Sequence, residues 1–328
     1  MKAIRWGIIG CGNVTEVKSG PGFQKAEGSE LVAVMRRNGE LAADYAARHG
    51  VPRWYDDADK LIQDPEVDAV YVATPPSSHK EYAIKCAAAG KPVYVEKPMA
   101  LDAEECQHML EACEEKGVPL FVAFYRRALP YFTRIKELLE SGAIGEIRYL
   151  TMTQHQPAGV NSGAEVLPWR LDPAVSGGGL FVDLASHTLD IMDFLLGPIR
   201  SVQGAAGNQA GLYAAEDIVT GSFVFENGVQ ATGTWCFSAY DYCDRNELVG
   251  SKGKLVFSTF GNERIEVITA EGVEVIELEK PLHIQQPLIQ LIVNELRGGE
   301  PSPSNGLSAM RTSRVMDELL RDYKTGRQ

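Results

Sequence analysis

Two stretches of the sequence carry side chains whose types and spacing suit acid-base chemistry. In the first, the apolar run 93–95 is followed at once by Glu96, Lys97 and Pro98. Three successive apolar residues predict a strand buried on both faces, and Lys97 then stands at its carboxyl end, where open α/β sheets bind ligands. Pro98 favours an extended Lys97 and allows a cis Lys97–Pro98 bond, so we expect an oriented ammonium group. Such a group can stabilise negative charge on a substrate oxygen; the alternative is an ordinary surface lysine.

The second stretch follows three consecutive glycines at 177–179. If it is helical, Asp183, His187 and Asp190 fall at i, i+4 and i+7 on one face, and the other faces are almost wholly apolar. Short Asp, Ser and His groups fit beneath a covering element better than they suit a solvated face, which is the alternative. A carboxylate one turn before a histidine can orient the ring for general acid-base catalysis. The same groups can also ligate a metal, but no further Cys, His or Glu cluster at ligand spacing supports a metal site.

The chain begins with elements that can position a dinucleotide. Residues 3–9 read as a buried strand that runs into Gly10 and Gly12, and a helix start follows. Glycines in that context let the backbone approach a pyrophosphate, although a tight strand-helix turn is the simpler alternative. Thr15 departs from the fingerprint, because its third position is usually Gly or Ala.

Two arginines follow the next predicted strand, 30–35. Arg36 and Arg37 stand where an acidic residue would hold the ribose hydroxyl of NAD. A guanidinium group can instead pair with a 2′-phosphate and stack on adenine. The sequence therefore favours NADP over NAD, against the alternative of two solvated arginines.

Strands and helices alternate through the first part of the chain. Further strands are predicted at 67–73 and 118–124, and helices at 39–49, 57–63 and 103–116. This alternation predicts an α/β fold, a doubly wound parallel Rossmann sheet over residues 1–124. The first strand's glycine loop and the ends of two later strands should converge on one crevice. We expect cofactor-binding residues there, namely Gly10, Gly12, Asn13, Val14, Arg36, Arg37, Thr74, Pro75, His79, Glu96 and Lys97.

The pattern changes over residues 125–328, which we expect to form a C-terminal α+β domain. Helix 130–141 and strand 146–153 come first, and helices 285–297 and 307–323 close the chain. Between them, segments pair as hairpins and predict an open, largely antiparallel sheet. These hairpins join 218–225 with 229–237, 247–250 with 254–258, and 265–269 with 273–278. No helix is obvious for the outer face of this sheet, so a second copy of the chain, in a dimer or tetramer, is a reasonable cover.

Several further side chains can line a substrate cleft. They are aromatic, basic or imidazole groups at element ends, and each is more often structural when judged alone. They are Tyr125, His155, Trp169, Arg170 and Trp235.

Composition restricts the partners and the compartment. The net charge of −12 disfavours nucleic acid and anionic membrane surfaces, and no long apolar span predicts a membrane helix. The six cysteines lack a Cys-x-x-Cys pair, which suits reduced thiols. We therefore expect a cytoplasmic protein.

In this order and spacing, the motifs resemble the Gfo/Idh/MocA family of glucose-fructose oxidoreductase, inositol dehydrogenase and their relatives. The resemblance spans nearly the whole chain and rests on these motifs: Gly10-Cys11-Gly12, Thr74-Pro75 with His79, Glu96-Lys97-Pro98, Trp169-Arg170 with Asp172-Pro173, and Gly177-Gly178-Gly179 to Asp183, His187 and Asp190. Thr15 departs from the family pattern, as does Ala185, which stands where a glycine is usual.

The resemblance implies a Rossmann domain, a second domain whose open sheet makes oligomer contacts, and hydride transfer between a nicotinamide ring and a sugar or cyclitol hydroxyl. Lys97 matches the family's catalytic lysine, and Asp183 and His187 match its active-site acid and histidine. Either Lys97 or His187 then carries the hydroxyl proton. Two other functions stay open: a glycosidase that holds NAD and uses reversible oxidation, and a non-catalytic NADP sensor.

Overall fold

The computed structural model describes residues 2–159 and 168–326. The chain divides into two compact units, residues 1–129 with 281–310 and residues 130–280 with 311–328. The sequence places all of 125–328 in one domain, whereas the structure groups 281–310 with the first unit. The physical reason is packing: α10 (Gln286–Leu296) lies against α2 (Gly20–Lys25), where a Cβ atom on Gly22 would come within 2.8 Å of Ile289.

The first unit contains a six-stranded parallel sheet in the order β3-β2-β1-β4-β5-β6. This is the strand order of dinucleotide-binding folds, and it confirms the predicted Rossmann sheet. Its strands are β1 (Ile4–Ile9), β2 (Ser29–Met35), β3 (Arg53–Tyr55), β4 (Ala69–Val72), β5 (Val93–Val95) and β6 (Leu120–Val122). Its other helices are α1 (Asn13–Val17), α3 (Gly39–His49), α4 (Ala58–Gln63), α5 (His79–Ala88) and α6 (Ala103–Lys116), with 3₁₀ turns η1 (Pro76–Ser78) and η2 (Tyr125–Ala128).

The local chemistry of the helices explains their bounds. Asn38, Asp57 and Asp102 cap α3, α4 and α6 by accepting backbone N–H groups. The buried strands β4, β5 and β6 present apolar side chains to both faces, as a parallel sheet between helices requires.

The second unit contains an eight-stranded sheet in the order β14-β13-β12-β11-β7-β10-β9-β8. All neighbouring pairs are antiparallel except β7 with β10, so the predicted open, largely antiparallel sheet is confirmed. The strands are β7 (Ile147–His155), β8 (Ile199–Gly207), β9 (Ile218–Phe225), β10 (Gln230–Cys236), β11 (Cys243–Gly250), β12 (Gly253–Phe257), β13 (Arg264–Thr269) and β14 (Gly272–Glu277). Each of the three predicted hairpins forms.

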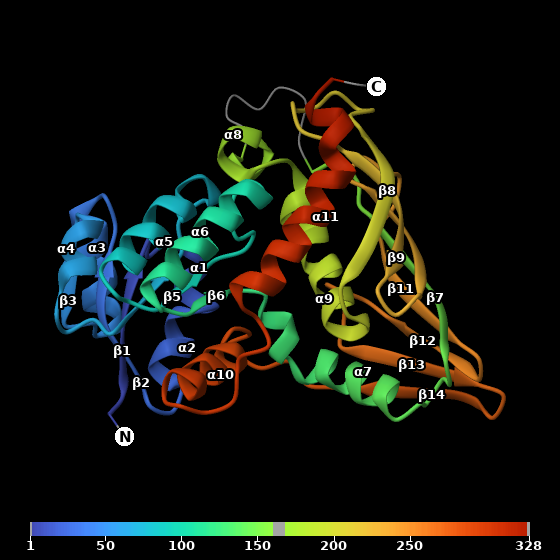
Figure 1. Cartoon of the computed structure of the whole chain (residues 1–328), viewed down its shortest axis with the longest axis horizontal. Coiled ribbons are helices and arrows are strands. Elements are labelled where there is room, and N and C mark those ends of the chain that lie inside the picture. Colours follow the sequence, from blue (N-terminus) through green and yellow to red (C-terminus); the bar gives the residue numbers. More distant parts are fainter. Residues whose placement is uncertain (1, 160–167, 327–328) are drawn as a thin grey trace. The chain divides into compact units, whose positions relative to one another are not determined.

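Helices cover one face of this sheet, which we call the inner face. Figure 1 shows α7 (Pro130–Glu140), α9 (Ser186–Leu196) and α11 (Gly306–Lys324) along it. Leu319 of α11 packs directly on β8 and β9, since Cβ atoms on Gly204 and Gly221 would come within 2.4 and 2.8 Å of it. Shorter elements η3 (Trp169–Leu171), α8 (Pro173–Ser176) and the π-helical turn η4 (Phe181–Ala185) precede α9.

Strands β3 and β8 lie outside the sequence predictions. Both are edge strands, and neither shows a clear apolar alternation: β3 has three residues and β8 is rich in Gly, Ala and Ser. Pairing with a neighbour therefore determines them more than their own pattern does.

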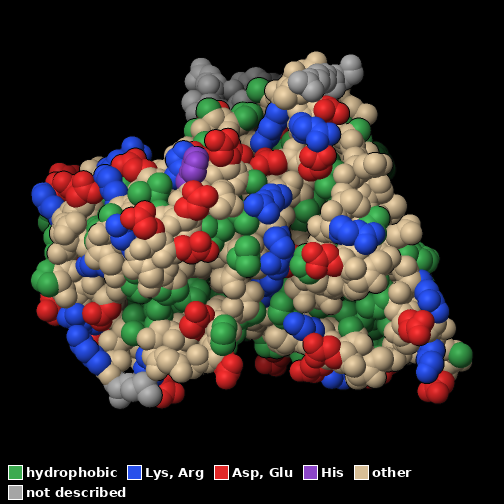
Figure 2. All heavy atoms as spheres, in the orientation of Figure 1, with side chains coloured by type: hydrophobic (Ala, Val, Ile, Leu, Met, Phe, Trp, Pro, Cys, Tyr) green, Lys and Arg blue, Asp and Glu red, His purple; other side chains and the backbone are tan. Residues whose placement is uncertain are grey.

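Acidic and basic side chains are interspersed on the face drawn in Figure 2, which shows no continuous basic stripe. Within the described residues, no helix has the length and apolar character needed to cross a bilayer.

Candidate active site

The turn after β1 is shaped by two glycines. Gly10 has φ +91°, and a Cβ atom there would lie 2.8 Å from Thr74 Cγ2, so only glycine fits between β1 and the exit of β4. Beside Gly12, in contrast, the nearest neighbour of an added Cβ would be an oxygen at 3.8 Å. The chain itself leaves the space beside Gly12 open, as a cradle for a pyrophosphate requires.

Thr15, the departure from the fingerprint, is accommodated without disrupting this turn. Its side chain is fully buried, and its hydroxyl donates to the Gly12 carbonyl oxygen over 2.8 Å. Its own carbonyl accepts from the Tyr45 hydroxyl over 2.9 Å. The extra atoms of threonine therefore brace the turn.

The arginines after β2 are accessible. Arg36 and Arg37 are exposed, and the Arg36 backbone N–H is held by the Tyr55 carbonyl of β3. The turn after β1 is bonded to the end of β2, because Gly10 N and Cys11 N both donate to the Met35 carbonyl, at 2.9 and 3.2 Å. The exposed arginines therefore lie next to the glycine turn.

His79 ties the exits of β4 and β5 together. The fully buried ring has Nε2 2.7 Å from the Thr74 carbonyl and Nδ1 3.1 Å from the Pro98 carbonyl. Burial lowers the pKa of His79. The Thr74 hydroxyl is bonded to Ser78 over 2.8 Å. The structure thus uses His79 to fix the backbone beside Lys97.

Glu96 and Lys97 directly follow β5, and their side chains have different surroundings. Glu96 is 8% exposed; its Oε1 accepts from Gln285 Nε2 at 2.7 Å and from the Tyr71 hydroxyl, and its Oε2 accepts from the Lys97 backbone N–H at 3.1 Å. Tyr94 donates to Gln285 Oε1 at 3.2 Å and stacks on Tyr71 with ring centroids 4.9 Å apart. Glu96 is therefore part of the support for Lys97, whose side chain is half-buried. The Lys97–Pro98 peptide bond that comes after it is cis, as Pro98 allows.

Tyr125 lies just past β6 in the same unit. Its hydroxyl accepts from the Arg126 guanidinium at 2.9 Å, and that group also lies 5.0 Å from the ring centroid. Both side chains are buried.

In the second unit, Asp183 lies on η4 and His187 on the first turn of α9. π-Helical turns are rare and often occur at functional sites. Glu216 positions this turn from below: its Oε1 accepts from Gly179 N at 2.8 Å, and the Gly179 carbonyl accepts in turn from Asp183 N at 3.2 Å. Burial raises the pKa of Glu216.

Arg170 meets Asp183. Its Nε lies 3.3 Å from Asp183 Oδ2, and its guanidinium group lies 4.4 Å from the Trp169 ring centroid. Both Trp169 and Arg170 are exposed. The structure therefore brings three of the predicted residues of this unit together.

His187 is buried against the loop between β12 and β13. The Phe260 ring meets the imidazole edge-on, with centroids 5.7 Å apart. Asp244 holds that loop, since its carboxylate accepts from the backbone N–H groups of Thr259 and Phe260 at 3.0 and 2.6 Å. On α9, Asp190 is fully buried and Asp193 pairs with Arg311 over two hydrogen bonds of 2.7 and 2.8 Å.

Two predicted cleft residues lie elsewhere. Trp235 is fully buried under Phe181, with ring centroids 5.3 Å apart, so it supports η4 from the core. His155 pairs in register with Cys236 and Cys243, on the face of the sheet opposite to Trp235. Neither joins Asp183 and His187.

Sequence reasoning missed four residues that shape these sites: Gln154, Glu216, Phe260 and Gln285. Of these four, only Gln154 could have been found from the sequence. Side chains on a strand alternate between its two faces, so Gln154 shares a face with the buried Leu150 and Met152, whereas His155 lies on the other face. Within the described residues, no group of three or more His, Cys, Asp or Glu side chains is arranged to hold a metal. The metal alternative for Asp183, His187 and Asp190 therefore has no geometric support.

The fold and the glycine turn define a class of dinucleotide-binding proteins, and comparisons narrow the class. The family model for an oxidoreductase family with an NAD-binding Rossmann fold, GFO_IDH_MocA, matches residues 4–124, and the GFO/IDH/MocA C-terminal domain matches residues 132–256. The chain is 41% identical over 96% of its length to "Oxidoreductase P35" of Formosa agariphila, of which it covers 97%. It is 28% identical to the myo-inositol 2-dehydrogenase of Thermotoga maritima, over 92% of this chain and 91% of that one.

A solved structure adds to this comparison. Levoglucosan dehydrogenase in complex with NADH and levoglucosan superposes with a TM-score of 0.86 at 25% identity, over 99% of this chain and 98% of that one. The chain therefore belongs to the Gfo/Idh/MocA family of oxidoreductases, whose Rossmann domain binds NAD.

Proposed function

We propose that this protein is a nicotinamide-dependent dehydrogenase that interconverts a secondary alcohol and a ketone on a sugar, cyclitol or related polyol. The observation that supports the proposal is the contact of the exposed Arg170 with Asp183 on the π-helical turn, directly before the α9 turn that carries His187, in a Gfo/Idh/MocA chain. Relatives named for inositol and levoglucosan support the polyol class.

The cofactor half of the proposal rests on the residues around the carboxyl edge of the parallel sheet. The open space beside Gly12 and the exposed side chain of Arg36 fit a dinucleotide whose nicotinamide supplies the hydride chemistry. Arg36 and Arg37 support NADP as the preferred form, with NAD as the alternative that the relatives' cofactors favour. The other proposed contacts are Gly10, Asn13, Val14, Thr74, Pro75 and Lys97.

In the proposed reaction, His187 exchanges the hydroxyl proton, with its ring confined by Phe260. Lys97 donates a hydrogen bond to the same oxygen and stabilises its developing charge, and exchange of their roles is the alternative. Asp183, already paired with Arg170, orients the histidine and binds a neighbouring hydroxyl. Tyr125 and Trp169 complete the proposed substrate surface.

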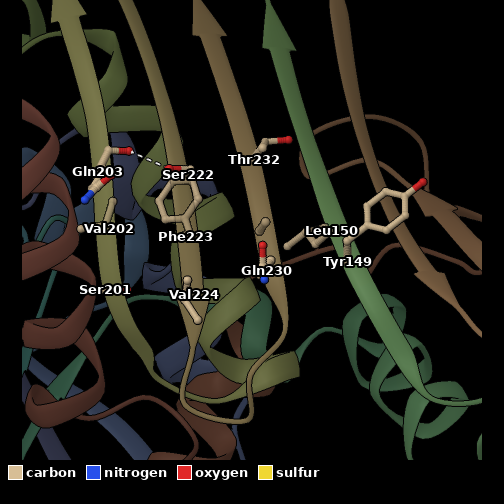
Figure 3. A pocket seen from close by; sticks show the side chains of 11 residues that line it. Tyr149, Leu150, Ser201, Val202, Gln203, Ser222, Phe223, Val224, Gln230 and Thr232 are labelled. Atoms are coloured by element: carbon tan, nitrogen blue, oxygen red, sulfur yellow. Dashed lines mark hydrogen bonds between the residues drawn. The ribbon is translucent and has the colours of Figure 1, made fainter.

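We further propose that the outer face of the eight-stranded sheet binds a second copy of the chain. Thr151, Thr220, Thr232 and Thr234 face outward on β7, β9 and β10 and are small and uncharged. Beside them on β11, Arg245 and Glu247 also face outward and pair with each other. A depression of ≈ 480 Å³ lies beside Thr232, bordered by Tyr149 and other residues of β7, β8, β9 and β10 (Figure 3). An exposed patch of uncharged side chains, as on β7, β9 and β10, is stabilised by a partner.

We also propose that the protein lies in the cytoplasm. All six cysteines are free, and four of them are buried. Thiols in that state support a reducing compartment such as the cytoplasm.

The test is a panel of cyclitols, aldoses and keto-sugars, each measured by absorbance of the reduced cofactor with NAD and NADP side by side. We expect turnover of at least one polyol. Absence of turnover across the panel contradicts the proposal, and cleavage of a glycosidic bond with a retained, unconsumed cofactor replaces it with the glycosidase alternative.

A further inference from the structure

The inner face of the eight-stranded sheet ends in a short polar row beneath the turn that carries Asp183. Gln154 of β7 pairs in register with Trp235 of β10 on one side and with Asp244 of β11 on the other. Trp235 contacts Phe181 of η4, and Asp244 holds the loop whose Phe260 meets His187. Gln154 therefore lies between the two residues through which the sheet supports η4 and the Phe260 loop.

Several buried polar groups near this row are hydrogen-bonded. Asn246 comes two residues after Asp244 on β11 and faces the same way, and its Nδ2 donates to Thr259 Oγ1 at 3.1 Å. Thr188 of α9 bonds to the same oxygen at 3.2 Å. These contacts fasten α9 and the Phe260 loop to the sheet.

Gln154 differs from these groups. It is 4% exposed, yet its Oε1 has no hydrogen-bond partner within residues 2–159 and 168–326. Nor has the indole Nε1 of its register neighbour Trp235, so this donor and this acceptor do not satisfy one another. A buried amide oxygen without a donor lowers stability, and such groups in native proteins mark an ordered water or a ligand contact.

We propose that Gln154 is a specificity-determining residue whose amide binds a hydroxyl of the polyol other than the one that reacts. This proposal rests on the proposed function. A neutral amide offers an acceptor and a donor, and a hydroxyl offers both in return. Gln154 therefore selects an uncharged polyhydroxylated substrate, and a substrate without that hydroxyl leaves the amide unpaired and is rejected.

The test uses Gln154→Met, which keeps the length of the side chain and removes its polar atoms. The matched control is Gln107→Met, the same substitution at a solvent-exposed hydrogen bond to Glu111 on α6. Three quantities are measured for each purified variant: the melting temperature, the increase of that temperature with saturating polyol, and kcat/KM for the best polyol and for its deoxy analogues.

We expect Gln154→Met to raise the melting temperature by roughly 2–4 °C, because it removes an unpaired buried group. We also expect it to lower kcat/KM by about 10- to 100-fold for the polyol while leaving one deoxy analogue unaffected. Gln107→Met should stay within about twofold of the wild type.

A Gln154→Met variant that melts at a lower temperature and keeps its kcat/KM overturns the proposal, because an ordered water then satisfies the amide. If the wild type turns over no polyol but the polyol-induced stabilisation is present and disappears in Gln154→Met, the proposed function fails and the role of Gln154 as a polyol contact stands. If neither variant nor wild type is stabilised by any polyol, both fail.

Discussion

Gln285 donates from Nε2 to Oε1 of Glu96 over 2.7 Å, although 189 positions separate the two residues in the chain. The bond joins the start of α10 to the exit of β5. Since the other oxygen of Glu96 accepts the Lys97 backbone N–H, the segment 281–310 helps to hold the proposed catalytic lysine.

Gln285→Leu should therefore lower both stability and turnover. Loss of the donor leaves a carboxylate that is 8% exposed with one fewer hydrogen bond, which costs about 1–3 kcal/mol. Denaturant unfolding and steady-state kinetics measure the two effects, and Gln290→Leu, at an exposed contact on the same helix, is the control. Unchanged stability in Gln285→Leu would contradict the support role.

Lys97→Met should reduce turnover by about 10²- to 10⁴-fold with cofactor affinity nearly unchanged, because it removes the proposed donor to the reacting oxygen. Cofactor fluorescence titration and kcat on the best polyol give the two values. Lys85→Met, at an exposed lysine paired with Asp59 and Glu81, should behave like the wild type. Near-normal turnover in Lys97→Met would sink the assignment.

Arg36→Ser should raise KM for NADP by about 10- to 100-fold and leave KM for NAD almost unchanged, because only NADP offers the 2′-phosphate to the guanidinium group. Both constants are measured on one substrate. A wild type that already prefers NAD refutes the NADP reading of Arg36 and Arg37.

Glu216→Gln should change the pH dependence of stability in a fixed direction. The folded state raises the pKa of Glu216, so it binds the proton more tightly than the unfolded chain does. The resulting stabilisation is present at acidic pH and is lost as pH rises from the ordinary glutamate range through the raised pKa. The melting temperature of the wild type minus that of Glu216→Gln should accordingly fall from about pH 4 to pH 8; a difference that rises with pH is the opposite of this expectation.

Thr232→Glu should dissociate the proposed dimer. The substitution places a charge in the uncharged patch formed by β7, β9 and β10, in register with Thr151 of β7 and Ser222 of β9. Sedimentation velocity reports the oligomeric state, and Thr220→Ser should leave it unchanged. A wild type that sediments as a monomer at all concentrations rules out this use of the face.

The sequence by itself determined most of the fold and indicated the residues proposed to react. Gly10 and Gly12 after an apolar strand, Lys97 after a second one and the three hairpins are local patterns, and local patterns suffice where one strand or turn decides the structure. The joint spacing of these motifs also indicated the family.

Only the tertiary structure decided which side chains support the chemistry. Gln285 reaches Glu96 and Glu216 reaches Gly179 through long-range packing, which leaves no periodic trace in the sequence. The same holds for the placement of Trp235 in the core. On β7, where successive side chains face opposite ways, a shift of one residue separates Gln154 on the inner face from His155 on the outer face, and the paired strands set that register.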